Sequence, residues 1–214
     1  MRRKLFGRDV ATTPMLTPRL VPWPVSALDD VDALVVTSQV AVKFLEQFPV
    51  SRDLPVFAVG PATADAARES GFREVTHGGG TAEKLLHAID AASFKGGLYL
   101  SARQVSRDLS LDRPSRIKRQ ITYEMTPAKS LPDLVINMIK SGQRFVVPFY
   151  SPRAFQVFES LTMHYGLEAH ISRAVAIAIH QRVFEAQTLP WGQTRIAVAP
   201  DGEGMIEALK TAAY

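Results

Sequence analysis

The segment LPVFAVGPATADAARESGF, residues 54–72, limits what this chain can fold into more than any other part of it. Its short apolar run predicts a buried strand over Pro55–Val59. Pro61 suits the first position of a helix, where its missing N–H would have no intrahelical partner, and Gly71 suits the position just past a helix end. We therefore predict a strand, a tight turn and a helix over Pro61–Ser70. This arrangement is typical of α/β proteins that bind ligands at the carboxyl ends of their strands.

Strands and helices alternate along the rest of the sequence. The other expected strands are Ala33–Ser38, Glu74–Thr76, Gly97–Ala102, Ile117–Met125, Phe145–Tyr150, Ala174–Ile179 and Arg195–Ala199. The other expected helices are Gln39–Gln47, Ala82–Ala92, Arg103–Leu111, Leu131–Ser141, Pro152–Leu161, a short one from His180, and Met205–Ala213. Lys4–Val10 could form either a short strand or an irregular segment. Pro22 and Pro24 restrict Arg19–Val25 to an edge strand or a connector. The alternation indicates βαβ units and parallel sheets.

The two halves of the chain resemble each other in outline. In residues 33–48 and again in residues 145–161, an apolar strand is followed by a serine, Ser38 or Ser151, and then by an alanine three positions later. We therefore predict an α/β fold class with two similar parallel-sheet domains.

Composition removes several classes of function. The 214 residues contain no cysteine, which excludes disulfides, thiol catalysis and cysteine-based metal sites, and the five histidines show no metal-ligand spacing. No apolar run is long enough to cross a membrane, and the N-terminus lacks the apolar core of a secretory signal. We expect a cytoplasmic protein without metal or cofactor. The net charge of +4 fits an anionic ligand as well as it fits nucleic acid.

Hydroxyl side chains follow several of the predicted strands, at Thr37, Ser38, Thr63, Ser101 and Ser151. With the adjacent helix N-termini they would form a lining rich in hydrogen-bond donors, suited to carboxylates or phosphates. Each of them could instead cap a helix, and for Thr63 capping of its own helix is the simpler alternative. The three glycines at 78–80 fit a plain turn better than a phosphate cradle.

Basic residues gather between the fourth expected strand and the next. They are Arg103, Arg107, Arg113, Arg116, Lys118 and Arg119. They could form a solvated basic face, a positive rim for a polyanionic substrate, or a weaker nucleic-acid surface. Tyr123 follows them. It is either an ordinary strand residue or a phenol that donates a proton to a leaving hydroxyl.

Five segments in this order resemble the uroporphyrinogen-III synthase family. They are VTSQVAV (36–42), VFAVGPATADAARESGF (56–72), GGGTAEKLL (78–86), ITYEMTP (121–127) and FYSPRAF (149–155). The resemblance implies a second α/β domain, residues 25–127, inserted into a first one built from 1–24 and 128–214. Two antiparallel linker strands, about 21–25 and 121–127, would join them. Because only about twenty residues precede the first linker strand, either the true start lies upstream or the first domain is abbreviated at its N-terminal part.

The family's reaction closes hydroxymethylbilane into uroporphyrinogen III with inversion of the last pyrrole ring, as a step of tetrapyrrole and heme biosynthesis. It needs no metal or cofactor. Loss of the terminal hydroxyl gives an azafulvene, which attacks the substituted carbon of the last ring and passes through a spiro intermediate. The substrate also closes unaided to the wrong isomer, so the enzyme mainly orients it. We expect no nucleic-acid or membrane partner and a monomeric protein.

The resemblance also implies roles for individual residues. Tyr123 matches the tyrosine that assists departure of the hydroxyl, so it is the one catalytic prediction. The predicted substrate-binding residues are Thr63, Ser38, Ser101, Arg107 and Ser151. One departure from the family pattern lies at IHQRVF (179–184), where His180 and Arg182 stand in place of a glycine and a threonine.

A second hypothesis differs in class. A two-lobed, non-catalytic protein that closes on an anionic small molecule would have the same sequence features. Incubation with hydroxymethylbilane distinguishes the two, because only a synthase yields the type III isomer in excess.

Overall fold

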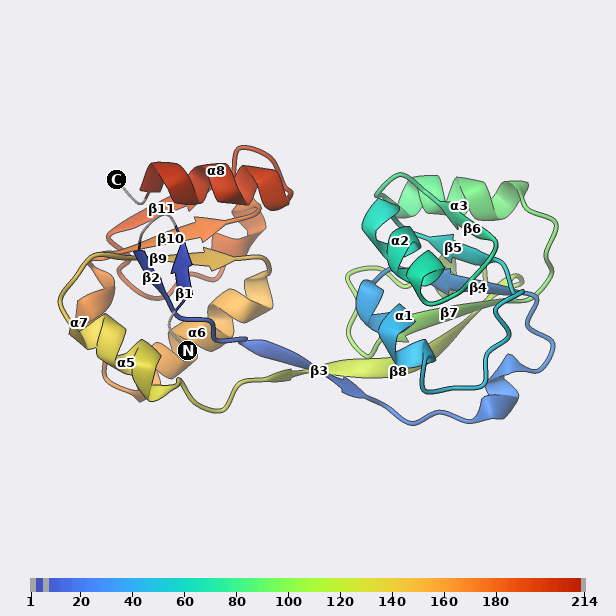
Figure 1. Cartoon of the computed structure of the whole chain (residues 1–214), viewed down its shortest axis with the longest axis horizontal. Coiled ribbons are helices and arrows are strands. Elements are labelled where there is room, and N and C mark those ends of the chain that lie inside the picture. Colours follow the sequence, from blue (N-terminus) through green and yellow to red (C-terminus); the bar gives the residue numbers. More distant parts are fainter. Residues whose placement is uncertain (1–2, 6–7, 213–214) are drawn as a thin grey trace. The chain divides into compact units, whose positions relative to one another are not determined.

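The computed structural model describes residues 3–5 and 8–212, and the chain divides into two compact units. Unit 1 consists of Met1–Thr17 and Pro127–Tyr214, and unit 2 is Pro18–Thr126. Both units contain a sheet with helices packed on it (Figure 1). The expected α/β fold class with mainly parallel strands is confirmed.

The sheet of unit 2 has the strand order β3-β8-β7-β4-β5-β6. Its strands are β3 (Leu16–Leu20), β4 (Ala33–Val36), β5 (Val56–Ala58), β6 (Val75–His77), β7 (Gly97–Ala102) and β8 (Ile117–Pro127). Its helices are η1 (Val25–Leu28), α1 (Gln39–Leu45), α2 (Pro61–Glu69), α3 (Ala82–Ala91) and α4 (Leu109–Asp112). Strands β4 to β8 are parallel. β3 runs antiparallel to β8, because Val21 N–H bonds to Thr122 O whereas Ala128 N–H bonds to Met15 O.

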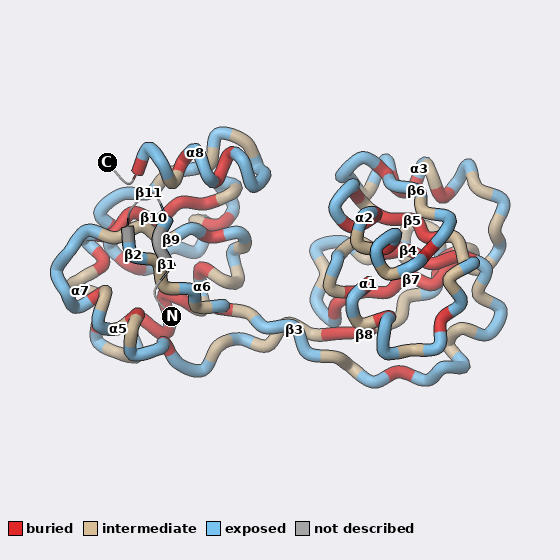
Figure 2. The backbone as a smooth tube through the Cα atoms, in the orientation of Figure 1, coloured by how far each residue is buried: buried red, intermediate tan, exposed pale blue. Residues whose placement is uncertain are grey.

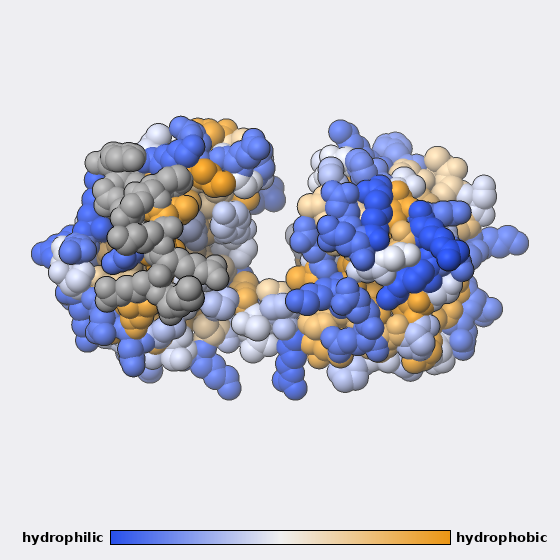
Figure 3. Space-filling view, viewed as in Figure 1, coloured by the Kyte–Doolittle hydropathy of each residue, from blue (hydrophilic) through white to orange (hydrophobic). Residues whose placement is uncertain are grey.

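Alternate residues of the central strands face two separate cores. On β4, Leu34 and Val36 pack with residues of α1 and α2, whereas Ala33 and Val35 pack with α3. All four residues of β4 are fully buried, and Figure 2 shows the buried positions concentrated in the strands. The outer surfaces of α1 and α2 carry mainly hydrophilic residues on the face shown in Figure 3. A strand buried on both faces is what the continuous apolar runs of the sequence indicate.

Unit 1 contains a three-stranded parallel sheet of order β11-β10-β9. Its strands are β9 (Phe145–Phe149), β10 (Ala174–Ala178) and β11 (Gln193–Ile196), and β1 (Arg3–Leu5) pairs with β2 (Arg8–Val10) in an antiparallel hairpin. Its helices are α5 (Asp133–Lys140), α6 (Pro152–His164), α7 (Glu168–Ile171), η2 (Gln181–Phe184) and α8 (Gly202–Ala212). α5, α6 and α7 pack on one face of the sheet, whereas α8 packs on the other.

The structure corrects the expected elements at several places. The strand expected at Arg195–Ala199 is β11, the helix expected from His180 is the 3-10 helix η2, and α7 was not expected. The strand expected at 21–25 lies earlier, as β3, and the chain after it is irregular because Pro22 and Pro24 have no N–H for a ladder. The helix expected over Arg103–Leu111 is only α4, since the preceding loop is held by side-chain bonds described below. The last helix begins at Gly202, and Ala213, its expected end, lies outside the described residues.

A buried carboxylate holds the segment before β11 against α6. Glu159 is only 2% exposed and accepts four hydrogen bonds. The donors are the N–H and hydroxyl of Thr188, the N–H of Leu189 and the Nε1–H of Trp191, at 2.7–3.1 Å. Phe149, Phe155 and Phe158 pack around the same indole. The carboxylate can only accept hydrogen bonds, and it is surrounded by four donors. It therefore fixes the 188–191 segment against α6.

We expect Glu159→Gln to lower the free energy of unfolding by about 2–4 kcal/mol, because the amide NH₂ would face donors and leave buried groups unpaired. Urea denaturation measures the change. Glu207→Gln, at a side chain that is 55% exposed, is the matched control and should change stability by less than about 0.5 kcal/mol. Equal effects of the two substitutions would contradict the interpretation.

Candidate functional site

The strand order of unit 2 places a topological switch point between β4 and β7. From β4 the chain moves to β5 and β6 on one side of the sheet, and then returns to β7 and β8 on the other. Crossover connections leave in opposite directions there, so the carboxyl ends of β4 and β7 mark the place where open α/β sheets usually bind ligands. Thr37 follows β4, and its Oγ1 lies 3.3 Å from the Tyr99 hydroxyl of β7. Burial raises the pKa of the Tyr99 phenol, which keeps it protonated at neutral pH.

The N-terminus of α2 offers unused hydrogen-bond donors at the same edge of the sheet. Its N-cap is Gly60, and no side chain caps the helix. Among the described residues, the N–H groups of Ala62 and Thr63 have no acceptor. Thr63 is 7% exposed and its hydroxyl makes no hydrogen bond in this part of the chain, so the capping alternative for Thr63 is wrong. These groups can donate to an anion.

The glycines at 78–80 pack against the start of α2. Gly78 N–H and Gly80 N–H bond to the carbonyls of Ala58 and Val59, at 2.9 and 2.7 Å. A Cβ on Gly78 would overlap the backbone of Leu85, whereas a Cβ on Gly80, whose φ is 105°, would meet no atom within 4 Å. The segment is therefore a fixed turn that lets β6, α2 and α3 approach closely.

Tyr123 lies on β8, and its ring packs at the edge of the α1-side core. It is 6% exposed, and its centroid is 6.0 Å from that of Phe44 on α1. Its hydroxyl makes no hydrogen bond to any described residue. Among those residues, Trp23 Nε1 is the one enclosed side-chain N or O atom without a partner. The Tyr123 oxygen is consequently not enclosed, and it can reach water or a ligand.

The three predicted serines have structural partners. Ser38 caps α1 by accepting from Val40 N–H at 3.1 Å, and Ser151 caps α6 in unit 1 by accepting from Ala154 N–H at 3.2 Å. Ser101 is 1% exposed; its hydroxyl donates to Ala102 O and accepts from Arg119 Nε–H. The hydroxyl of Ser101 is thus enclosed within the protein.

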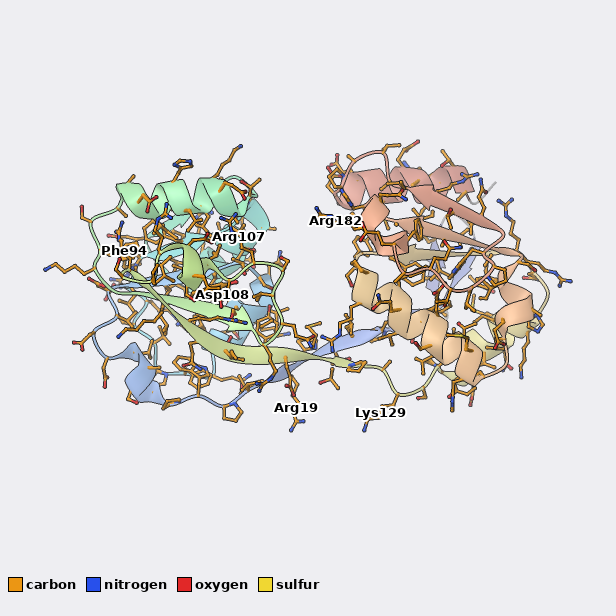
Figure 4. All side chains as sticks on the ribbon, turned by 180° about the vertical axis from the view of Figure 1, so that it is seen from behind. Arg19, Phe94, Arg107, Asp108, Lys129 and Arg182 are labelled. Atoms are coloured by element: carbon orange, nitrogen blue, oxygen red, sulfur yellow. The ribbon has the colours of Figure 1, made fainter. Side chains whose placement is uncertain are left out.

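Four arginines of the basic cluster pair with carboxylates of their own unit, and a fifth, Arg116, donates to carbonyls. Arg107 binds Asp112 with two hydrogen bonds, at 2.9 and 3.0 Å, and also contacts Glu83 of α3 (Figure 4). Other pairs follow the same pattern: Arg103 with Glu124, Arg113 with Asp90, and Arg119 with Asp108. Arg116 donates to the carbonyls of Ala92 and Phe94 and lies over the Phe94 ring. The charge of Arg107 is therefore already compensated, and its substrate-binding role stays a prediction.

Comparisons with known proteins add the family. The family model described as uroporphyrinogen-III synthase HemD matches residues 6–207. This chain belongs to the uroporphyrinogen-III synthase family. Members are enzymes of porphyrin and heme biosynthesis, so the resemblance of the five segments, the enzyme class and the main function hypothesis are confirmed.

The fold of this chain is similar to that of a solved uroporphyrinogen-III synthetase. The synthetase from Helicobacter pylori is similar with a TM-score of 0.71 and 20% identity, over 92% of this chain and 90% of that chain. The synthase from the extremely thermophilic bacterium Thermus thermophilus has 18% identity over 94% of this chain and 87% of its own, with a TM-score of 0.44. A search of curated protein sequences gives no match.

In this member of the family, the described residues contain no cluster of three or more His, Cys, Asp or Glu side chains able to hold a metal ion. No helix in the described part of the chain is long and apolar enough to cross a membrane. Hydroxyls and N–H groups without partners among the described residues lie at the carboxyl edge of the unit 2 sheet, and such groups suit carboxylates and proton donation.

Sequence analysis missed Tyr99, whose hydroxyl lies beside Thr37. It named Arg119 only as one member of the basic cluster, and not as a residue that holds the loop after β7. A signal for that role was available. It lies between Ile117 and Ile121 at strand spacing, so an arginine occupies an inward-facing position of a sheet. A cation there needs buried acceptors, and the sequence does not say which loop supplies them.

Asp108 makes the stability of this edge dependent on pH. Burial alone would raise its pKa, but hydrogen bonds from Ser110 and Arg119 outweigh that effect and lower the pKa below its usual value. A carboxyl group whose pKa is lower in the folded state stabilises the protein above its unfolded pKa of about 3.9. This contribution is lost as the pH falls through the folded pKa.

We therefore expect Asp108→Asn to lower the free energy of unfolding by about 1 kcal/mol at pH 7. The gap between variant and wild type should narrow as the pH is lowered below about 4, through the lowered pKa of the folded state. Urea unfolding at several pH values measures it. Asp29→Asn, at an exposed aspartate that forms no ion pair among the described residues, is the control. A gap that stays constant with pH would refute the linkage.

Proposed function

We propose that this chain converts hydroxymethylbilane to uroporphyrinogen III with unit 2 supplying the catalytic phenol and carboxylate-binding groups. The family match carries the reaction. The free hydroxyl of Tyr123 beside the switch-point edge supports the placement of the chemistry. The substrate class is a small tetrapyrrole bearing eight carboxylates.

In the proposed reaction, the Tyr123 phenol donates its proton to the terminal hydroxyl of the substrate as the carbon–oxygen bond breaks. Water leaves, and an azafulvene cation remains on the first ring. Its electrophilic carbon bonds to the substituted carbon of the last ring, and the resulting spiro intermediate fragments and closes again in the inverted order. A pyrrole position releases one proton at the end, which restores the phenol through solvent. One water is lost overall.

Thr63 and the N-terminus of α2 are proposed to bind substrate carboxylates. Two unpaired N–H groups and an unpaired hydroxyl converge on the start of a nine-residue helix. Its dipole favours negative charge at that end, by about 0.3–1 kcal/mol near the surface. Such contacts orient a flexible chain, and orientation is the larger part of this catalysis.

The finer organisation is also a proposal. We propose two α/β domains connected by β3 and β8, with the first domain built from both ends of the chain. We also propose that the protein is a monomer that acts in the cytoplasm, as the sequence predicts. Ser38, Ser101, Ser151 and Arg107 remain proposed substrate-binding residues, although each of these side chains already has a partner within the protein.

We expect Tyr123→Phe to lower kcat about 100-fold, since general acids contribute about 10²–10⁴-fold, and to leave the fold intact. Coupled assay of hydroxymethylbilane turnover, with separation of the type III and type I isomers, measures the effect. Tyr165→Phe, at the end of α6, is the matched control and should retain wild-type turnover. If Tyr123→Phe forms the type III isomer at the wild-type rate, Tyr123 has no role in the mechanism.

We expect Thr63→Val to raise KM about tenfold with little change in kcat, because a charge-assisted hydrogen bond is worth about 1.5–3 kcal/mol. Valine keeps the shape of threonine, so packing in α2 is retained. Thr76→Val on β6, an exposed site, should leave KM unchanged. An unchanged KM in Thr63→Val would remove Thr63 from the substrate-binding site.

A further inference from the structure

β8 contains an extra residue just before Tyr123. Along the β7–β8 ladder, Ser101 is paired with Ile121, but the next residue, Ala102, is paired with Tyr123. Thr122 is therefore left over, in a β-bulge at the carboxyl end of β7. Thr122 and Tyr123 are both buried. In a regular strand with one buried face, consecutive residues would alternate between buried and exposed. Bulges turn the following side chain to a new direction and recur beside functional sites.

The bulge changes the face on which Tyr123 lies. Ile117 packs with α3 and α4, and Arg119 is paired with Tyr99, which belongs to the same core. Two-residue alternation from Ile117 and Arg119 would place position 123 on that face too. Instead, Tyr123 packs with Phe44 in the core on the α1 side. Met125 continues on the α1 side, so the shift is kept beyond the bulge.

The Arg119 guanidinium holds the strand and loop that face the bulge. Its Nε–H donates to Ser101 Oγ at 2.8 Å, and its Nη2 group donates to the carbonyls of Ala102 and Arg103 at 2.8 and 2.9 Å. Its Nη1 group donates to Asp108 Oδ2 at 2.8 Å. The side chain is 21% exposed, so water competes little for these donors.

Further hydrogen bonds connect Arg119 and its acceptors to Tyr123. Arg103 N–H donates to Tyr123 O at 2.8 Å, and the same Arg103 peptide segment is held through its carbonyl by Arg119. The Thr122 hydroxyl donates to Ser101 O at 3.4 Å. Arg103 Nε–H also bonds to Glu124, the residue after Tyr123. The backbone of Tyr123 is thus fixed on both sides by residues that Arg119 orders.

We propose that Arg119 is a positioning residue for the cyclisation: it stabilises the β8 bulge and so keeps the Tyr123 hydroxyl on the α1 face of the sheet. The inference rests on the proposed role of Tyr123. The requirement is for a planar fork and not only for a positive charge, since four acceptors lie around one guanidinium. Lysine would retain the pairing with Asp108 but has no second nitrogen to reach the carbonyls of Ala102 and Arg103.

The test is a double-mutant cycle on kcat for type III formation, using Arg119→Gln, Tyr123→Phe and the double variant. We expect Arg119→Gln to lower kcat about 10- to 100-fold with less than about a threefold change in KM, since misplacement of a reacting group has effects of that size. In the Tyr123→Phe background the same substitution should lower kcat less than about twofold, because Arg119 acts through the phenol.

Conservative and matched variants separate geometry from charge and from general destabilisation. Arg119→Lys should have a kcat within about threefold of that of Arg119→Gln. Arg73→Gln removes another arginine of unit 2 that pairs with an aspartate, Asp53, at an exposed site, and should keep wild-type kcat. Thermal unfolding shows whether each variant is folded at the assay temperature. If Arg119→Gln is not folded there, the same cycle with Arg119→Lys decides the question.

The outcomes are distinct. Equal losses of kcat from the Arg119 substitution in both backgrounds, or wild-type kcat in Arg119→Lys, would overturn the positioning role while Tyr123 remained catalytic. Wild-type kcat in Tyr123→Phe would instead overturn the proposed function of Tyr123, whatever the Arg119 variants do. A loss from the Arg119 substitution that is large only when Tyr123 is present is the expected pattern.

Discussion

Burial of β4 and β7 on both faces is the constraint on which unit 2 depends. Every residue of these two strands is buried, so helices must cover both sides of the sheet, and each Val or Leu placed there contributes about 1.5–3 kcal/mol. Parallel strands need crossover connections, which bring the carboxyl ends of β4 and β7 to the same edge. The same packing that stabilises the sheet therefore creates the edge at which Thr37, Thr63 and Tyr123 lie.

That edge is supplied with neutral donors, while most of its charges are paired internally. Arg107, Arg113 and Arg119 each bind an aspartate of the same unit, which removes them as free cations. The groups without partners among the described residues of this edge include the N–H groups at the start of α2 and the hydroxyls of Thr63 and Tyr123. Such neutral donors hold carboxylates by hydrogen bonds, without a strong electrostatic field. This suits a substrate that must fold over itself while its carboxylates stay bound.

Much of the fold could be predicted from local pattern, and the exceptions have physical causes. The segment from β5 to α2 was predicted to within one residue at each boundary, because Pro61 and Gly71 mark the helix ends by their own backbone preferences. The helix expected over Arg103–Leu111 was wrong, since Arg119, which lies beyond that segment on β8, binds the carbonyls that a helix would use. Thr63 was placed correctly in the first turn, but its lack of a cap bond is visible only once Gly60 is seen as the N-cap.

The sequence by itself determined the α/β class, the alternation of strands and helices, and the family, because continuous apolar runs, proline and glycine act over a few neighbouring residues. The tertiary structure decided the direction of the Tyr123 side chain and the partners of the arginines. Both depend on contacts between residues far apart in the chain, such as Arg119 with Ser101 and Ala102 with Tyr123. A one-residue bulge moves a side chain to the opposite face without changing the hydrophobic pattern around it, so no local rule could have placed that phenol.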